Sequence, residues 1–297
     1  MGGARVPGVG PSLPPAVKVG LTRARSLAWR TRTGGRNDAS GLRILLYHRV
    51  ADDDDPLSLA PRRFREQMEY LAAGGYTAVD LMSAVAMLDA GELPPQVLGL
   101  TFDDGFIDVR DEALPALAEH GFRATVFVTT GVSDGRHPFP WYAAGQPPVL
   151  GWDDITALDR EGTLRFEAHT VSHPNLLSID DAAARSEIAD SRRELEQHLG
   201  RPVSAFAYPA GLYGERERRL VGEAGYTVGV TCEPGVNLPS SDRMALRRRQ
   251  IDRGDRLLDF RAKIGGGHDT PLPMRALYRR LRYGTGAGRS RRLSSRA

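Results

Sequence analysis

The feature that most constrains the fold is a regular alternation of short apolar segments with longer amphipathic ones. Helix-like segments, such as residues 61–73 and 178–199, separate runs suited to buried strands. The clearest of these runs are 43–47 (RILLY), 97–102 (VLGLTF), 124–129 (ATVFVT) and 164–168 (LRFEA). Strands that alternate with helices form βαβ units and a parallel sheet. With roughly seven or eight such units in one core, a closed or nearly closed barrel is favoured over an open doubly wound sheet.

Charge is distributed unevenly along the chain. Residues 1–40 carry a net charge of +6 and residues 275–297 a net charge of +8, which leaves −11 for the middle. We expect a basic, disordered leader over 1–40, a single barrel domain over 41–274 and a basic tail over 275–297. The acidic body disfavours a nucleic-acid partner. The basic ends are suited to weak contact with an anionic membrane surface.

Two further features bear on the cellular location of the protein. Cys232 is the only cysteine, which excludes an internal disulfide. No apolar run approaches the length of a transmembrane helix, and Pro14, Pro15 and Lys18 interrupt what would be the apolar core of a signal peptide. We therefore expect a cytoplasmic protein with neither segment, peripheral at the inner face of the membrane if its basic ends bind lipid.

Four of the expected strands are followed directly by polar residues or by a turn that exposes its backbone. Asp103 and Asp104 follow 97–102, His169 follows 164–168, His48 follows 43–47, and the turn 208–211 (YPAG) follows a further strand. In parallel α/β barrels the carboxyl ends of the strands share one face, on which active sites assemble. The sequence therefore predicts that these residues converge on one site.

These residues supply the ligands of a catalytic metal site. His173 lies four residues after His169, and two imidazoles with one or two carboxylates suit a divalent ion that keeps open positions for water. The side chains of the adjacent aspartates point in different directions, so one can bind the metal while the other accepts a proton. The alternatives are a turn or helix cap for the aspartates and ordinary surface positions for the histidines. A serine-hydrolase elbow at 131–135 (GVSDG) lacks the helix that must follow it.

Three motifs together carry a family resemblance. They are TFDDG at 101–105, HTVSH at 169–173 and FAYPAG at 206–211. In order and spacing they resemble the NodB-homology polysaccharide deacetylases over roughly residues 41–265, and the Tyr47-His48 pair is similar to that of the branch with an early Tyr-His motif. The resemblance implies a distorted seven-stranded (β/α) barrel. It also implies removal of acetyl groups from N-acetylated sugars with a divalent metal, Zn²⁺ first and Co²⁺ or Ni²⁺ as alternatives.

The resemblance also assigns roles by position. Asp103 would be the general base that accepts a proton from a metal-activated water, and Asp104, His169 and His173 would bind the metal. The backbone N–H of Ala210 would help to stabilise the oxyanion.

This sequence departs from the family pattern at two places. Ala207 stands where the family carries an arginine that orients the catalytic aspartate, and we expect Arg248 to take over that role. The late histidine motif that supplies the general acid is also missing. We expect His48 to serve as the acid in preference to His268.

The sequence therefore predicts a metal-dependent hydrolase that deacetylates an N-acetylhexosamine unit of a sugar, an oligosaccharide or a lipid-linked glycan. The alternatives are an amidohydrolase acting on a non-carbohydrate C–N bond and a catalytically inactive glycan-binding scaffold. Phe139, Trp141 and Tyr142, in the long loop after 124–129, could either stack on a sugar or pack against the barrel.

Overall fold

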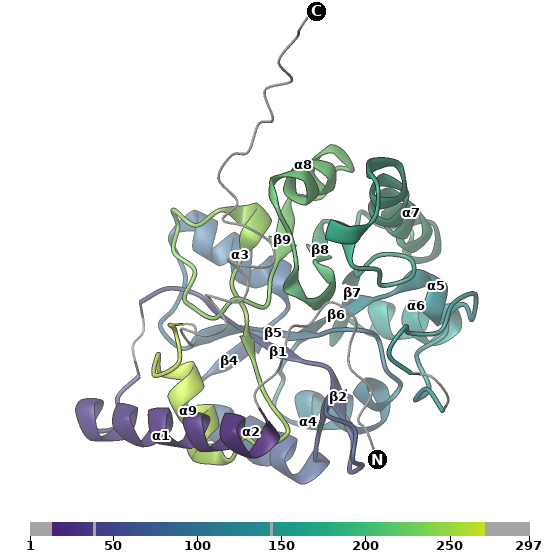
Figure 1. Cartoon of the computed structure of the whole chain (residues 1–297). Coiled ribbons are helices and arrows are strands. Elements are labelled where there is room, and N and C mark those ends of the chain that lie inside the picture. The colour runs from purple at the N-terminus through teal and green to yellow at the C-terminus, as the bar shows by residue number, and fades with distance from the viewer. Residues whose placement is uncertain (1–13, 38–39, 143–144, 271–297) are drawn as a thin grey trace, which may run out of the picture.

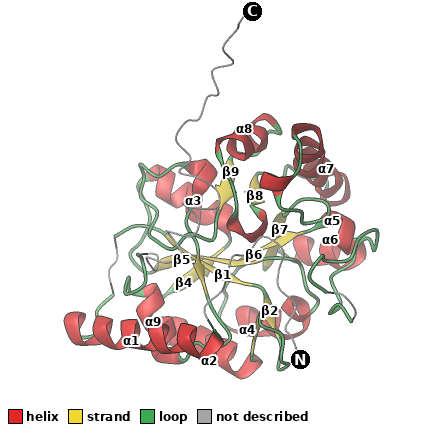
Figure 2. Cartoon of the chain, in the orientation of Figure 1, coloured by secondary structure: helices red, strands yellow, loops and turns green. Residues whose placement is uncertain are grey.

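The computed structural model describes residues 14–37, 40–142 and 145–270, and a curled, mostly parallel sheet surrounded by helices forms its centre (Figures 1 and 2). The strands are β1 (Arg43–Tyr47), β2 (Arg49–Val50), β3 (Ser58–Leu59), β4 (Thr77–Val79), β5 (Val97–Phe102), β6 (Ala124–Val128), β7 (Leu164–Ala168), β8 (Ala205–Ala207), β9 (Val228–Val230) and β10 (Arg249–Gln250). The helices are α1 (Pro15–Thr33), α2 (Pro61–Ala73), α3 (Leu81–Ala90), α4 (Leu114–Glu119), α5 (Thr130–Ser133), α6 (Trp152–Glu161), α7 (Asp181–Leu199), α8 (Glu215–Glu223) and α9 (Leu257–Ile264). The strands expected at 43–47, 97–102 and 164–168 have those bounds.

The sheet curls into the distorted seven-stranded (β/α) barrel that the sequence predicts. Around the sheet of the described chain the strands follow the order β10-β1-β5-β6-β7-β8-β9. Leu246 forms a parallel bridge with Val230 at the end of β9, and β10 immediately afterwards pairs with β1. The short segment from Leu246 to Gln250 therefore joins the two edges of the sheet.

The distortion lies next to β5. The first half of this strand pairs with β4, from Val97 to Gly99, and its end pairs with β6 through Thr101 and Phe102. β4 thus separates β5 from β6 over part of their length, and this irregularity accounts for an eighth strand in the sheet.

Side chains alternate between the inside and the outside of the barrel, as the two-residue period of a strand requires. Ile44, Phe127 and Ala205 belong to an inner apolar cluster, to which α3 adds Val85 and Leu88. A second cluster lies between the strands and the surrounding helices, with members such as Leu45, Phe102, Phe166, Met68 and Ile188. The barrel therefore has a core that is packed on both faces of the sheet.

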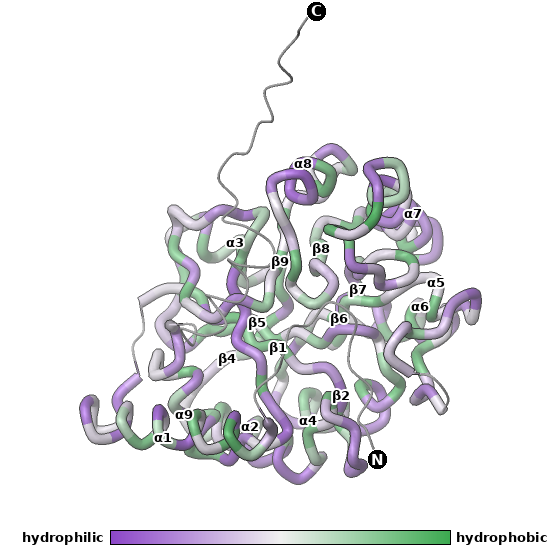
Figure 3. The backbone as a smooth tube through the Cα atoms, viewed as in Figure 1, coloured by the Kyte–Doolittle hydropathy of each residue, from purple (hydrophilic) through white to green (hydrophobic). Residues whose placement is uncertain are grey.

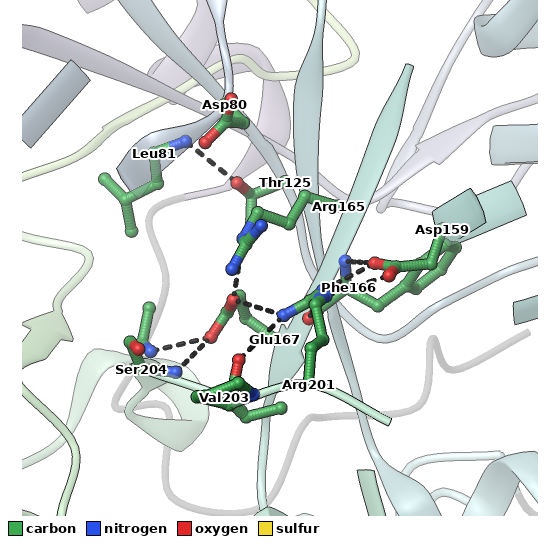
Figure 4. A network of polar contacts seen from close by, with 12 residues as sticks. Asp80, Leu81, Thr125, Asp159, Arg165, Phe166, Glu167, Arg201, Val203 and Ser204 are labelled. Carbon is green, nitrogen blue, oxygen red and sulfur yellow. Dashed lines mark hydrogen bonds and ion pairs between the residues drawn. The ribbon is translucent and has the colours of Figure 1, made fainter. Parts of the chain in front are cut away.

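A buried polar network ties β7 to the start of β8 (Figure 4). Glu167 is fully buried and accepts hydrogen bonds from the backbone N–H groups of Ser204 and Ala205, at 2.8 and 2.7 Å. Arg165 and Arg201 form ion pairs with the same carboxylate at 3.2 and 3.3 Å. Burial of a carboxylate is costly unless it is paired in this way, so the network is a structural element of the barrel.

The expectation of a disordered leader over residues 1–40 is wrong for the part that the structure describes. Residues 15–33 form α1, which packs on α9 (Figure 1). Trp29 is buried, and its indole N–H donates to the Gly265 carbonyl at 3.0 Å. Composition suggests disorder here, but a buried tryptophan and ion pairs to the barrel domain supply the interactions that order the helix. The tail expected over 275–297 lies outside the described residues. Among the described helices, none combines the length and the hydropathy needed to cross a bilayer.

Candidate active site

The predicted site residues meet at the carboxyl ends of the barrel strands. Their loops hold unusual backbone conformations. Within the described residues, every non-glycine residue with positive φ belongs to these loops: Asp104 (74°), Thr170 (67°), His173 (57°) and Ala210 (53°). Such conformations are strained for side-chain-bearing residues and concentrate at functional sites. The four positions identify this end of the barrel as the candidate site independently of the motifs.

Asp104, His169 and His173 form a buried cluster of three ligand atoms. The Asp104 Oδ1 atom lies 3.6 Å from His169 Nε2 and 3.7 Å from His173 Nε2, and all three atoms lie within 4.8 Å of one another. Ligand atoms bound to one Zn²⁺ are roughly 3.3 Å apart, given bond lengths of about 2 Å. The Asp104 Oδ1 atom is buried and has no hydrogen-bond partner within the described residues. A divalent cation fits both the spacing of these atoms and the unpartnered oxygen.

The electrostatics of the cluster also suit a cation. Burial lowers the pKa of His169, and burial together with the neighbouring His169 brings the pKa of His173 well below its ordinary value. Both imidazoles are therefore neutral, with a lone pair for a metal. Burial, reinforced by the charge of Asp103, raises the pKa of Asp104 well above its ordinary value. This carboxylate needs a positive partner in order to stay ionised.

Backbone contacts fix the orientation of the two histidines. His169 Nδ1 lies 2.7 Å from the Ala207 carbonyl, so this nitrogen carries the proton and leaves Nε2 facing Asp104. Glu187 of α7 accepts hydrogen bonds from the N–H groups of Val171 and Ser172, both at 2.9 Å, and thereby holds the loop that carries His173. Glu187 was not among the predicted site residues. Nothing in the sequence distinguishes it from the other charged residues of its helix.

Asp103 is held by Arg248. The guanidinium Nη1 and Nη2 atoms donate to the two carboxylate oxygens of Asp103 at 2.6 and 2.7 Å. Arg248 is completely buried, also donates to the Thr231 carbonyl at 3.0 Å, and lies over the Phe127 ring. Burial alone would raise the pKa of Asp103, but the charge of Arg248 outweighs burial with help from the histidines, so this pKa lies below its ordinary value. The structure thus brings together the two residues that the sequence analysis pairs.

The two candidate general acids lie in different places. His48 is half-buried at the end of β1, and burial lowers its pKa to about 4, while the nearby Asp103 acts in the opposite direction. His268 instead lies beneath α1, with its Nε2 atom 3.1 Å from Ser26 Oγ. The structure brings His48 to the site and places His268 against α1.

Ala210 and the aromatic loop complete the surroundings. The Ala210 N–H has no hydrogen-bond acceptor within the described residues, and the adjacent Gly211 packs so closely on Cys232 that a Cβ atom would lie 2.5 Å from the Cys232 nitrogen. Phe139 and Trp141 are buried and stack on each other. The rings of Trp141 and His173 pack edge to face, with their centroids 4.6 Å apart. The aromatic loop therefore packs against a proposed metal ligand.

Comparisons with known proteins agree with the fold and with the resemblance that the motifs carry. Residues 90–229 match the family model described as polysaccharide deacetylase. The Bacillus subtilis protein YxkH, provisionally named a polysaccharide deacetylase, is 28% identical over 72% of this chain and 72% of its own length. The poly-beta-1,6-N-acetyl-D-glucosamine N-deacetylase of Staphylococcus epidermidis is 23% identical over 69% of this chain and 76% of its own.

A solved structure extends the comparison to the fold. The Streptococcus pyogenes deacetylase PplD, in complex with acetate, superposes with a TM-score of 0.66 and 24% identity, over 75% of this chain and 98% of that one. Residues 90–229 thus match the polysaccharide deacetylase model that the motifs indicate, and the expected resemblance to the NodB-homology deacetylases is confirmed.

Proposed function

We propose that this protein is a metal-dependent hydrolase that removes the N-acetyl group from an N-acetylhexosamine unit of a glycan or glycoconjugate. The observation that carries the proposal is the buried, unpartnered Asp104 Oδ1 atom facing two neutral imidazoles, directly beside the Asp103–Arg248 pair. The name of the S. epidermidis relative supports an N-acetylated sugar as the substrate. Asp104, His169 and His173 would hold the ion.

Asp103 is placed to act as the general base. A divalent ion bound by its three neighbours would polarise the amide carbonyl and acidify a water molecule. Asp103 would accept the proton of the attacking water, because its carboxylate remains ionised and fixed by Arg248. Asp103 precedes Asp104 in the chain, so the proposed base lies next to the proposed metal ligands. Its own carboxylate oxygens accept hydrogen bonds from Arg248 instead.

Two other groups would act on the substrate. The Ala210 N–H, fixed after Pro209 and free of an acceptor within the described residues, would donate to the oxyanion without reorganisation. His48 would donate a proton to the departing amine, since the charges of Asp103 and Arg248 act on it. It would do so in its protonated form, which its pKa of about 4 makes the minority form at neutral pH. Water attacks the carbonyl carbon, the C–N bond breaks, and acetate and the free amine leave.

The test is acetate release from a panel of N-acetylated substrates. The panel contains chito-oligosaccharides, a nucleotide-linked sugar, a lipid-linked mimic and simple aromatic amides, each assayed with chelator and after Zn²⁺ or Co²⁺ is restored. Asp103→Asn should abolish release, whereas Asp153→Asn, an exposed aspartate in the first turn of α6, should leave it unchanged.

Each outcome of this panel favours one of three candidate functions. Release that requires both metal and Asp103 supports the proposal. Release from small amides but not from sugars would favour a non-carbohydrate amidohydrolase. Glycan binding without release by the metal-loaded protein would favour an inactive scaffold.

A further inference from the structure

Helix α1 presents its apolar side chains outward. Within the described residues, four of the five exposed large apolar side chains belong to this helix: Val17 (45%), Val19 (37%), Leu21 (40%) and Leu27 (47%). The other exposed residues from Pro15 to Ala28 are proline, alanine or glycine. A surface helix of a globular protein normally shows the opposite pattern, with charged residues toward water.

The charged residues in this part of α1 face the barrel domain instead. Lys18 forms an ion pair with Asp252, and Arg23 with Asp259 at 3.1 Å. Arg25 donates to the Thr270 carbonyl at 2.9 Å. These contacts and the buried Trp29 dock the helix and fix which face is turned outward. Hydrophilic and hydrophobic residues alternate along the helix in Figure 3.

The end of the helix adds exposed positive charge. The helix contains five basic residues and no acidic residue. Arg30 and Arg32 in its last turn are exposed and form no ion pair within the described residues, and the same holds for Arg36 just beyond it. The 19-residue helix is about 28 Å long, so its outer face forms an extended apolar stripe that ends in exposed arginines.

We propose that the outer face of α1 binds the surface of an anionic lipid bilayer. An interfacial helix places its apolar face at the boundary between headgroups and acyl chains and its basic residues among anionic headgroups. A second copy of this chain is a poorer partner for the face, because it would bring two sets of exposed arginines together. The inference is independent of the proposed function, since lipid binding is measured without substrate.

The test is flotation of the full chain with vesicles of phosphatidylcholine alone or with roughly 30% phosphatidylglycerol at low salt. We expect preferential binding to the anionic vesicles. The triple variant Val17→Gln, Leu21→Gln, Leu27→Gln should bind roughly tenfold more weakly or worse, because it loses the apolar face. Val19 is left in place because it packs on Gly254. The double variant Arg30→Gln, Arg32→Gln should lose roughly fivefold per arginine.

Matched controls separate this surface from general effects. The double variant Arg185→Gln, Arg193→Gln removes two exposed arginines from α7, and Leu238→Gln removes the one exposed large apolar side chain of the described residues that lies outside α1. Both should bind like the parent chain, and all variants should keep its unfolding temperature. Absence of binding, binding unaffected by the α1 substitutions, or a dimer in light scattering that the triple variant abolishes would each overturn the proposal.

Discussion

The Asp103 carboxylate stays charged in a buried site because both of its oxygens accept hydrogen bonds from one guanidinium. Arg248 comes from the segment that closes the barrel, and not from the motif position occupied by Ala207. The same ion pair therefore serves two purposes. It orients the proposed base, and it compensates for a charge that would otherwise be expensive to bury.

Replacing Arg248 with glutamine should therefore damage both turnover and stability. We expect acetate release to fall as far as in Asp103→Asn, and the free energy of unfolding to drop by about 3–5 kcal/mol, because a buried carboxylate loses its partner. Urea unfolding and acetate assays measure the two effects. The neighbouring exposed Arg247→Gln should change neither, and adding Asp103→Asn to Arg248→Gln should recover part of the lost stability. Near-normal turnover in Arg248→Gln would exclude the assigned role.

The two histidines proposed as acids can be separated by their pH profiles. His48→Gln should lower kcat by about 10²–10⁴-fold and remove the fall in rate as the pH rises through the pKa of His48, because a general acid must be protonated to act. His268→Gln, against α1, should keep this limb. A His48→Gln enzyme that retains this limb would show that another group donates the proton.

The sequence was a better guide to the candidate site residues than to the residues that hold them in place. The aspartates and histidines were found because they follow apolar strands in motifs with fixed spacing. Arg248 could be inferred because a buried base needs a cation and the expected arginine is missing. Glu187 could not be inferred, since it reaches the His173 loop from a helix with charged residues along much of its length.

At the level of elements, α1 is the main departure from expectation. Its segment lacks the inward apolar stripe by which amphipathic helices are recognised, because its inward face holds Lys18, Ser26 and Trp29. The helix is held by tertiary contacts that no local pattern reveals. The strands, by contrast, are short apolar runs. Once the helices around them are placed, few secondary structures other than a buried strand are open to such runs.

The docking of α1 should weaken in acid through His268. Burial, with the positive charges of Lys263, Arg249 and Arg25, lowers the pKa of this histidine from 6.5 to about 3, although Asp252 acts in the opposite direction. The unfolded chain binds this proton below pH 6.5 and the folded chain does not, so stability is complete above pH 6.5 and falls as the pH drops toward 3. The expected loss is about 1.4 kcal/mol per pH unit.

Hydrogen exchange of the α1 amides and urea unfolding between neutral and acidic pH measure this loss. His268→Gln should reduce the slope by one proton, and His120→Gln, at the end of α4, is the matched control. An identical slope in His268→Gln and the parent would assign the acid sensitivity to other groups.

At the scale of the whole molecule, the proposed ion should stabilise the barrel by mass action. Zn²⁺ at about 100 times its dissociation constant should contribute about 2.7 kcal/mol to a chelator-treated sample. For a chain of this size we expect the unfolding temperature to rise by roughly 5–10 °C. Asp104→Asn should abolish the rise and Asp153→Asn should retain it. A rise that persists in Asp104→Asn would mean that the ion binds elsewhere.

The closure of the barrel by the segment from Leu246 to Gln250 has a consequence for the order of events during synthesis. Asp103 and Arg248 are 145 residues apart, so most of the strands leave the ribosome before the partner of the base exists. Until then the adjacent carboxylates of Asp103 and Asp104 lack the guanidinium and repel each other. Completion of the sheet and pairing of the proposed base with Arg248 are thus a single late step, and we expect no hydrolysis by a nascent chain that has not reached residue 248.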